Sequence, residues 1–79
     1  MRKPKFLKVH WHDAQSVDGW TFKSDIEPSL AMVVTLGHLV KEDVDTVVIA
    51  LNHDETNDSY SCFINIPKKW IVQRKTVKA

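Results

Sequence analysis

Five short segments of β-type sequence, separated by turn residues, place the strongest limit on how this chain can fold. In the first segment Leu7, Val9 and Trp11 alternate with polar residues, which is the period of two typical of a half-buried strand. The other segments are rich in β-branched and apolar residues. We therefore predict a mostly β fold with no long helix and with strands at residues 5–13, 31–41, 46–52, 60–66 and 71–77.

The first connection, residues 14–30, is predicted to be a long loop. Trp20 and Phe22 are expected to anchor it to the core, because large aromatic side chains gain most from burial. Ser24 and Glu27 have the spacing of a capping box, which predicts a single helical turn near residues 24–27.

Gly37 and Pro67 interrupt the strand pattern at two informative positions. An isolated glycine in a strand usually marks a bulge, a bend or a close approach of two backbones. Pro67 has no N–H donor and a fixed φ, so it favours a tight turn over a continued strand. A strand bent at a glycine lets a small sheet close on itself. We expect a small five-stranded antiparallel barrel of the SH3-like or Sm-like type; the alternative is an open sheet with a helix at residues 20–30.

The length of 79 residues predicts a single domain, residues 1–79, with its core at about 5–77. A domain this short has a thin core. Large aromatic side chains are therefore expected to supply much of it, and a thin core with open sheet edges leads us to expect a homo-oligomer. The six expected anchors are Phe6, Trp11, Trp20, Phe22, Phe63 and Trp70.

Cys62 is the only cysteine, so the chain cannot form an intramolecular disulfide. We expect it to be a small buried residue on a strand, in a reducing compartment. The longest apolar stretch, residues 30–36, is far shorter than the roughly 20 residues that a membrane helix needs. No apolar run of signal-peptide type follows the basic first residues. These features predict a soluble, cytoplasmic protein with no membrane partner.

Five sequence cues in a fixed order resemble a group of short, mostly uncharacterised proteins of tailed bacteriophages, over roughly residues 7–72. The resemblance implies a small accessory phage protein that acts in the host cytoplasm by binding nucleic acid or host proteins. It assigns no role to any residue. The cues are Val9-x-Trp11-x-Asp13-Ala14, Gly19-Trp20, Val34-x-x-Gly37-x-Leu39-Val40, Val47-Val48-Ile49-Ala50 and Ile66-Pro67-x-x-Trp70-Ile71.

The sequence offers little that predicts catalysis. His10 and His12 fall on one face of a strand and could bind a metal together with Asp13, His38 or His53. Local spacing fixes only two of those ligands, so we expect exposed polar residues and no metal. No Ser-His-Asp or Cys-His arrangement and no glycine-rich phosphate loop is present. We expect no catalytic residue, no cofactor and a protein that is not an enzyme.

The charge pattern favours a binding protein. Nine of the eleven Lys and Arg residues lie in two terminal blocks, and all ten acidic residues lie between Asp13 and Asp58. First and last strands of small barrels commonly lie side by side, which would join the two blocks. Cations beside an aromatic ring are typical of single-stranded nucleic acid binding. The predicted nucleic-acid-binding residues are Lys8, His10, Lys68, Lys69, Trp70, Arg74 and Lys75.

Two alternatives remain open from the sequence. Acidic loops at residues 42–45 and 54–58 would bind and inhibit a basic host protein, in counter-defence or host takeover. An oligomer would instead form pockets between subunits that sequester a small nucleotide.

Overall fold

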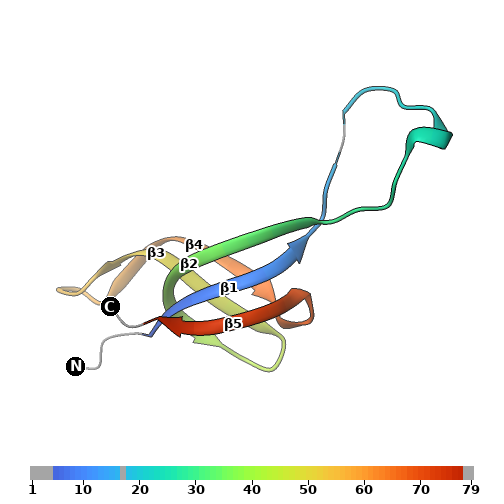
Figure 1. The fold of residues 1–79 in the computed structure, drawn as a ribbon. Helices are drawn as coiled ribbons and strands as arrows, with labels where there is room; N and C mark the ends of the chain where they lie inside the picture. Colours follow the sequence, from blue (N-terminus) through green and yellow to red (C-terminus); the bar gives the residue numbers. More distant parts are fainter. Residues whose placement is uncertain (1–4, 17, 78–79) are drawn as a thin grey trace.

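The computed structural model describes residues 5–16 and 18–77 as one antiparallel sheet and two short 3₁₀ helices (Figure 1). The five strands predicted from the sequence are confirmed, with ends shifted by one or two residues at most. The elements are β1 (Phe6–Asp13), η1 (Lys23–Asp25), β2 (Ala31–Glu42), β3 (Thr46–Asp54), β4 (Ser59–Pro67), η2 (Lys68–Trp70) and β5 (Ile71–Val77).

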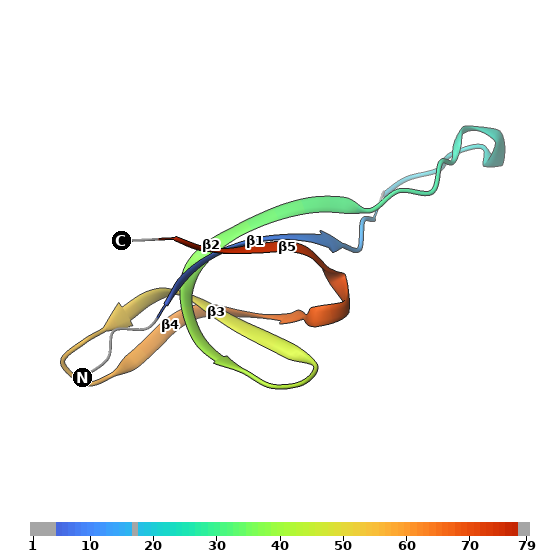
Figure 2. The ribbon, with the colours of Figure 1, turned by 60° about the horizontal axis from the view of Figure 1, so that its bottom comes forward.

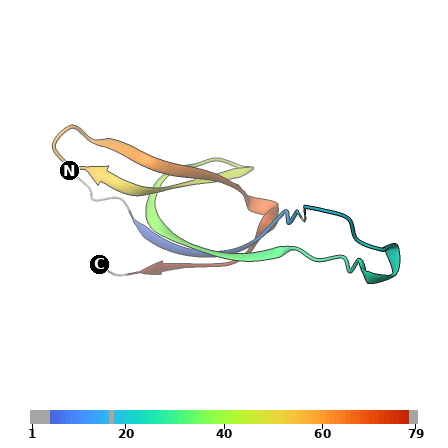
Figure 3. The ribbon, with the colours of Figure 1, turned by 90° about the horizontal axis from the view of Figure 1, so that it is seen from above.

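The long strand β2 belongs to both halves of the sheet. The strand order is β4-β3-β2-β1-β5. Residues Ala31 to His38 of β2 pair with β1, and residues His38 to Glu42 pair with β3. Figures 2 and 3 show β2 curving between these two parts, so that β1 and β5 form one layer and β3 and β4 form the other.

Gly37 lies at the curve of β2, where the strand passes very close to β3. A Cβ atom added at Gly37 would lie 2.5 Å from the backbone oxygen of Ala50 and 2.7 Å from Cγ2 of Ile49. Both distances are far below van der Waals contact, so only glycine fits. The predicted close approach at Gly37 is confirmed, and a shift in pairing register follows it between Leu39 and Lys41.

The core lies between the two layers of the sheet. The alternation predicted for β1 is confirmed, because Leu7, Val9 and Trp11 are buried while their neighbours are partly exposed. Ala50 is also buried, beneath the curve of β2. The core cluster consists of Leu7, Val9, Trp11, Val47, Ile49 and Ile66, with Val33, Leu39 and Ile71 packed against it.

Sheet hydrogen bonds do not close the structure into a barrel. Over the described residues β4 and β5 are the two edges of the sheet. The mostly β, five-stranded antiparallel part of the prediction is therefore confirmed, whereas the sheet is open. The alternative helix at residues 20–30 is not formed. The predicted turn after Pro67 is confirmed as η2, which leads into β5.

Residues 14–16 and 18–30, here called the arm, project from the ends of β1 and β2 (Figure 1). The expectation that Trp20 and Phe22 anchor this loop is wrong: their exposures are 104% and 81%. No layer of the sheet faces the arm, so neither side chain has a core to enter. The predicted helical turn forms slightly earlier, at Lys23–Asp25, without a capping side-chain hydrogen bond and without a buried residue.

Three further expectations about the core are wrong. Phe63 and Cys62, on the edge strand β4, are both exposed. Ile66 fills the core from this strand instead. Cys62 also has a φ of 55°, a left-handed backbone conformation that is uncommon outside glycine. Trp70, expected as a core anchor, is 45% exposed.

Candidate functional site

The first and last strands lie side by side, as predicted, whereas Arg2, Lys3 and Lys78 of the two basic blocks lie outside the described residues. β1 and β5 pair in antiparallel fashion, with Lys8 opposite Lys75 and Val9 opposite Arg74. Because neighbouring residues of a strand point to opposite faces, Arg74 lies on the side of the buried Val9 and Lys75 lies on the other side. The predicted basic patch is therefore divided between two faces of the sheet.

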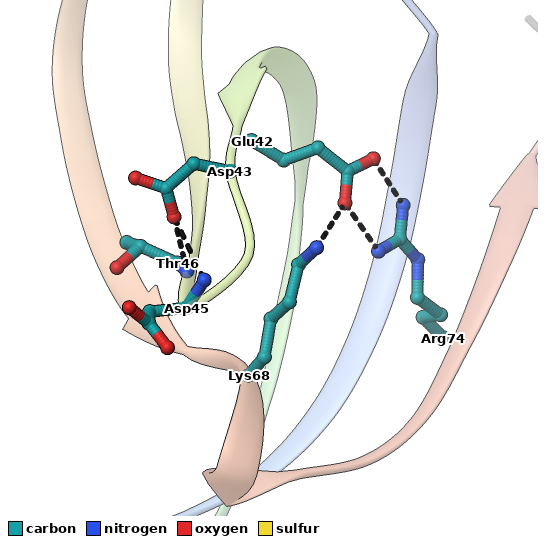
Figure 4. Close-up of polar contacts among 6 residues, drawn as sticks. All are labelled: Glu42, Asp43, Asp45, Thr46, Lys68 and Arg74. Carbon is teal, nitrogen blue, oxygen red and sulfur yellow. Dashed lines mark hydrogen bonds and ion pairs between the residues drawn. The ribbon is translucent and has the colours of Figure 1, made fainter.

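Lys68 and Arg74 both bind Glu42, at the end of β2 (Figure 4). The Arg74 guanidinium donates to both carboxylate oxygens, at 3.1 and 3.2 Å, and Lys68 Nζ lies 3.0 Å from Oε2. The hydrogen bonds from Arg74 and then Lys68 lower the pKa of Glu42 to about 2. The carboxylate holds η2 and β5 to the end of β2, on the side where sheet hydrogen bonds leave the structure open. These two cations are thus partly neutralised within the molecule.

The acidic turn at residues 42–45 is also engaged internally. Asp43 Oδ1 accepts hydrogen bonds from the backbone N–H groups of Asp45 and Thr46, at 2.9 and 2.8 Å (Figure 4). These bonds lower the pKa of Asp43. The Asp45 carbonyl accepts a further bond from the backbone N–H of Lys68. Glu42 and Asp43 therefore stabilise the turn and the contact with η2, and this loop offers less free acidic surface than its sequence indicates.

Replacing Glu42 with glutamine is expected to destabilise the fold in a pH-dependent way. The folded-state pKa of Glu42 lies below its ordinary value of 4.5, so its stabilising effect is present above pH 4.5 and disappears as the pH falls through about 2. Partly exposed ion pairs contribute little each, so we expect a loss of about 1 kcal/mol at pH 7. Urea unfolding at pH 7 and pH 2.5 measures it. The difference between Glu42→Gln and wild type should shrink at the lower pH.

Glu55→Gln, in the exposed β3–β4 turn, is the control, and an equal effect from it would contradict the role of Glu42.

Two of the remaining predicted cations, Lys8 and Lys75, lie on what we call the outer face, the side of β1, β2 and β5 turned away from the core. Lys8 and Lys75 are direct cross-strand neighbours there, and neither forms an ion pair within the described part of the chain. Like charges in this position destabilise a sheet. Lys8 and Lys75 therefore form a positively charged pair that no carboxylate of the described residues neutralises. His10, the next outward residue of β1, extends the polar strip toward the arm.

Beside this polar strip, the outer face is apolar along β2. The pairing places Leu36 next to Lys8 and Val34 next to His10. Met32, Val34 and Leu36 are 54%, 49% and 46% exposed. Exposed apolar side chains at every second position of a strand form a continuous stripe, which is typical of a surface that another molecule covers.

An open pocket of about 320 Å³, here called the base pocket, lies where the arm leaves the sheet. Its lining includes Leu30 from the arm, Trp70 and Lys69 from η2, and Val72 from β5. Trp70 is 45% exposed and stacks on the buried Trp11, with ring centroids 6.4 Å apart and an interplanar angle of 17°. The core thus holds the Trp70 ring in place at the wall of a mostly apolar pocket.

The four histidines lie in two separate places. His10 and His12 share the outer face of β1, as predicted, whereas His38 and His53 contact each other on β2 and β3. Within residues 5–16 and 18–77, no group of three or more His, Cys, Asp or Glu side chains is arranged to hold a metal ion. His10 and His12 do not meet His38 or His53.

A row of four rings crosses four strands, and sequence reasoning missed it. Phe6 contacts His38 at 5.3 Å between ring centroids, His38 contacts His53 at 5.8 Å, and His53 stacks on Tyr60 at 4.4 Å. His53 Nε2 lies 2.9 Å from Asp58 Oδ1. Burial and then the Asp58 carboxylate raise the pKa of Tyr60. Partners on four different strands leave no local spacing signal, so only the sheet register reveals the row.

The arm carries the most exposed tryptophan and phenylalanine side chains of the described structure. Beyond Trp20 and Phe22, its Ile26 and Leu30 are 59% and 62% exposed. Within the arm, the Ser29 hydroxyl donates to Gln15 at 3.1 Å and so joins its two limbs. The arm thus exposes aromatic and aliphatic side chains to solvent, and the hydrogen bond between Ser29 and Gln15 connects its two limbs near the sheet.

Comparison of the chain with family models, curated proteins and solved structures found no match. Over the described residues no helix has the length and apolar character needed to cross a membrane.

Proposed function

We propose that this protein acts without catalysis, by binding another protein through the arm, the outer face and the base pocket. The observation that carries the proposal is the complete exposure of Trp20 with the near-complete exposure of Phe22. Monomeric proteins rarely expose large contiguous apolar patches, and such patches mark interaction sites. Tryptophan and other aromatic residues dominate the binding energy of protein interfaces.

The proposed scaffold is a half-open barrel of the SH3-like or Sm-like type. Two features support it: β2 is shared by both layers of the sheet, and Glu42 joins the end of β2 to β5 where sheet hydrogen bonds do not. The resemblance to short phage proteins stays a prediction, and it adds that the partner would be a host or phage protein met in the host cytoplasm.

Nucleic acid binding is the second candidate, supported by the like-charged pair of Lys8 and Lys75. The site would keep Lys8, His10 and Lys75, with Lys69 and Trp70 at the base pocket. Lys68 and Arg74 contribute less, because both are bound to Glu42. This candidate ranks second because the net charge of the chain is only +1, whereas nucleic-acid-binding domains usually carry a strongly basic face.

Sequestration of a small nucleotide has weaker support. The base pocket, at about 320 Å³, lies at the lower end of the usual range of ligand pockets. It is open, and of the described residues that line it Lys69 is the one lysine or arginine, alongside the acidic Asp13.

Affinity purification of a tagged protein from the cells that produce it tests the proposal. The variant Trp20→Ser/Phe22→Ser removes the exposed aromatic pair, and Val44→Ser is the matched control, because Val44 is 84% exposed in the β2–β3 turn, away from the arm. We expect wild type and Val44→Ser to retain the same partner protein. The arm variant should lose it by about tenfold or more, as for interface hot spots.

Two other outcomes distinguish the candidates. If the eluate holds nucleic acid that is lost in high salt and in Lys8→Glu/Lys75→Glu, the second candidate replaces the first. If wild type and the arm variant retain the same proteins, and neither retains an untagged copy of this chain, protein binding through the arm is contradicted.

A further inference from the structure

We infer that the protein bound by the arm is a second copy of this chain. In the symmetric dimer, the arm of each protomer lies along the outer face of the other, and Trp20 of each enters the base pocket of the other. This inference rests on the proposed function, because it names the partner of the same surfaces. It is carried by the shape of the protomer, its apolar surfaces and its charges.

The shape of the protomer suits a reciprocal exchange of arms. Its extents are 56 × 23 × 22 Å, and the arm lies along the long direction (Figures 1 and 2). Trp20 and Phe22 lie along the projecting arm, and the base pocket lies where the arm leaves the sheet. Two arms placed antiparallel around a two-fold axis bring each projecting end to the base of the other. The arm of each protomer then contacts the same surface of the other protomer, so the interface forms twice by symmetry, as in most homodimers.

The apolar surfaces are large enough for a stable dimer. A standard interface buries about 800 Å² on each partner. Two aromatic side chains contribute roughly 150–250 Å² each when buried. The remaining area would come from the half-exposed aliphatic side chains of the arm and of the β2 stripe. These are Ile26, Leu30, Met32, Val34 and Leu36.

The base pocket is chemically suited to an aromatic anchor. Trp70, Leu30 and Val72 supply an apolar lining, and Trp70 is already held in place by Trp11. Aromatic pairs favour stacked or edge-to-face contact. An indole from a second copy would find that contact here. Its own Trp20 cannot supply it, because that side chain is wholly exposed in the protomer.

The charges of the arm and of the outer face are opposite. The arm carries Asp18, Asp25 and Glu27 against Lys23, a net charge of −2. On the outer face Lys8 and Lys75 are paired across β1 and β5, and neither forms an ion pair within the described residues. An acidic arm laid on the outer face would bring carboxylates to Lys8 and Lys75. The arm itself would then neutralise this like-charged pair. The same acidic arm would repel a nucleic acid, so charge favours the second copy over the phosphate backbone.

Sedimentation velocity and native mass measurement on the purified full chain test this inference. Wild type and Val44→Ser should be dimeric in the micromolar range. Trp20→Ser/Phe22→Ser should be monomeric, with a dissociation constant raised about tenfold or more, as for loss of a hot spot. Thermal unfolding checks that the variant is folded, which we expect because neither side chain is buried.

A pair of charge reversals gives the sharper test. Lys8→Glu/Lys75→Glu has an acidic arm and an acidic outer face, and Asp25→Lys/Glu27→Lys has a basic arm and a basic outer face. Each alone should be monomeric, and an equal mixture should form a heterodimer, because each arm then meets a face of opposite charge. Nucleic acid binding predicts no such rescue.

Three results would overturn the inference. Wild type could be monomeric throughout the micromolar range, the arm variant could dimerise like wild type, or the mixture of charge variants could stay monomeric. If wild type is monomeric and the affinity purification still shows a different protein lost with the arm aromatics, the proposed function stands and the second copy is excluded as its partner.

Discussion

Replacing Gly37 with alanine is expected to lower the free energy of unfolding by about 3 kcal/mol, the upper end of the usual cost of overpacking a core. The added Cβ would lie 2.5 Å from the Ala50 backbone oxygen. That oxygen cannot move away cheaply, because Ala50 pairs with His38 on one side and Phe63 on the other. Relief would require β2 to separate from β3 at the curve that joins the two layers.

Thermal unfolding followed by circular dichroism measures this effect. A loss of 1 kcal/mol lowers the Tm of a domain of this size by roughly 4–8 °C, so we expect a decrease of about 12 °C or more. Gly19→Ala is the control, because Gly19 lies in the arm with a φ of 97° and nothing within 4 Å of an added Cβ. Its strain can relax locally in a segment whose helix buries no residue. A Gly37→Ala variant as stable as wild type would contradict the close approach of the two strands.

The success at Gly37 shows which parts of the fold the sequence could predict. Alternation in residues 5–13 predicted the buried face of β1, since the period of two is a local property of the chain. The glycine inside an apolar strand predicted a close approach, and Pro67 predicted the turn before β5. Each of these signals lies within a few residues of the structure that it determines.

The errors concern residues whose environment depends on distant parts of the chain. Trp20 and Phe22 are hydrophobic enough to be core residues. The sequence around them does not indicate that the arm lacks a sheet layer to pack against. Phe63 lies in a regular strand, and its exposure follows from the position of β4 at the edge of the sheet. Strand order is a global property, so hydrophobicity alone did not separate these residues from the true core.

The candidate site was predicted in part for the same reason. The pairing of β1 with β5 joined Lys8 to Lys75, as expected from the usual neighbourhood of first and last strands. The sequence alone was enough to predict that Arg74 and Lys75 lie on opposite faces, since adjacent strand residues point to opposite faces. The ion pair of Arg74 with Glu42 could not be predicted from local sequence, because Glu42 lies 32 residues away along the chain. The alternation of residues along a strand predicts the face on which a side chain lies, but its contact partner depends on the complete fold.

Replacing Trp11 with alanine is expected to produce the largest single loss of stability. Trp11 is 4% exposed and belongs to the core cluster. Its Nε1 donates a hydrogen bond to Thr35 Oγ1 at 2.9 Å, and its ring supports Trp70. Deleting a buried aromatic side chain costs about 3–5 kcal/mol. Since small domains have little stability in reserve, Trp11→Ala should be largely unfolded at 37 °C.

Trp70→Ala provides the matched comparison, because it removes the other ring of the same stack. Trp70 is 45% exposed, so its loss leaves no enclosed cavity and should cost about 1 kcal/mol, the usual value of an aromatic pair. Urea unfolding of both variants measures the difference. Equal losses would show that the two rings contribute alike and would contradict the view of Trp11 as the buried support.

The same pair of variants connects the core to the proposed interface. Trp11→Phe should keep a ring in the core but lose the hydrogen bond to Thr35 and part of the support under Trp70. If Trp70 receives the arm of a second copy, Trp70→Ala should weaken the dimer far more than it destabilises the protomer. Trp11→Phe should do the reverse, losing about 1–2 kcal/mol of unfolding free energy while dimerisation is largely kept. Sedimentation of both folded variants measures dimerisation, and their unfolding curves measure stability. Comparing the two measurements distinguishes Trp70, which lines the pocket, from Trp11, which only supports it.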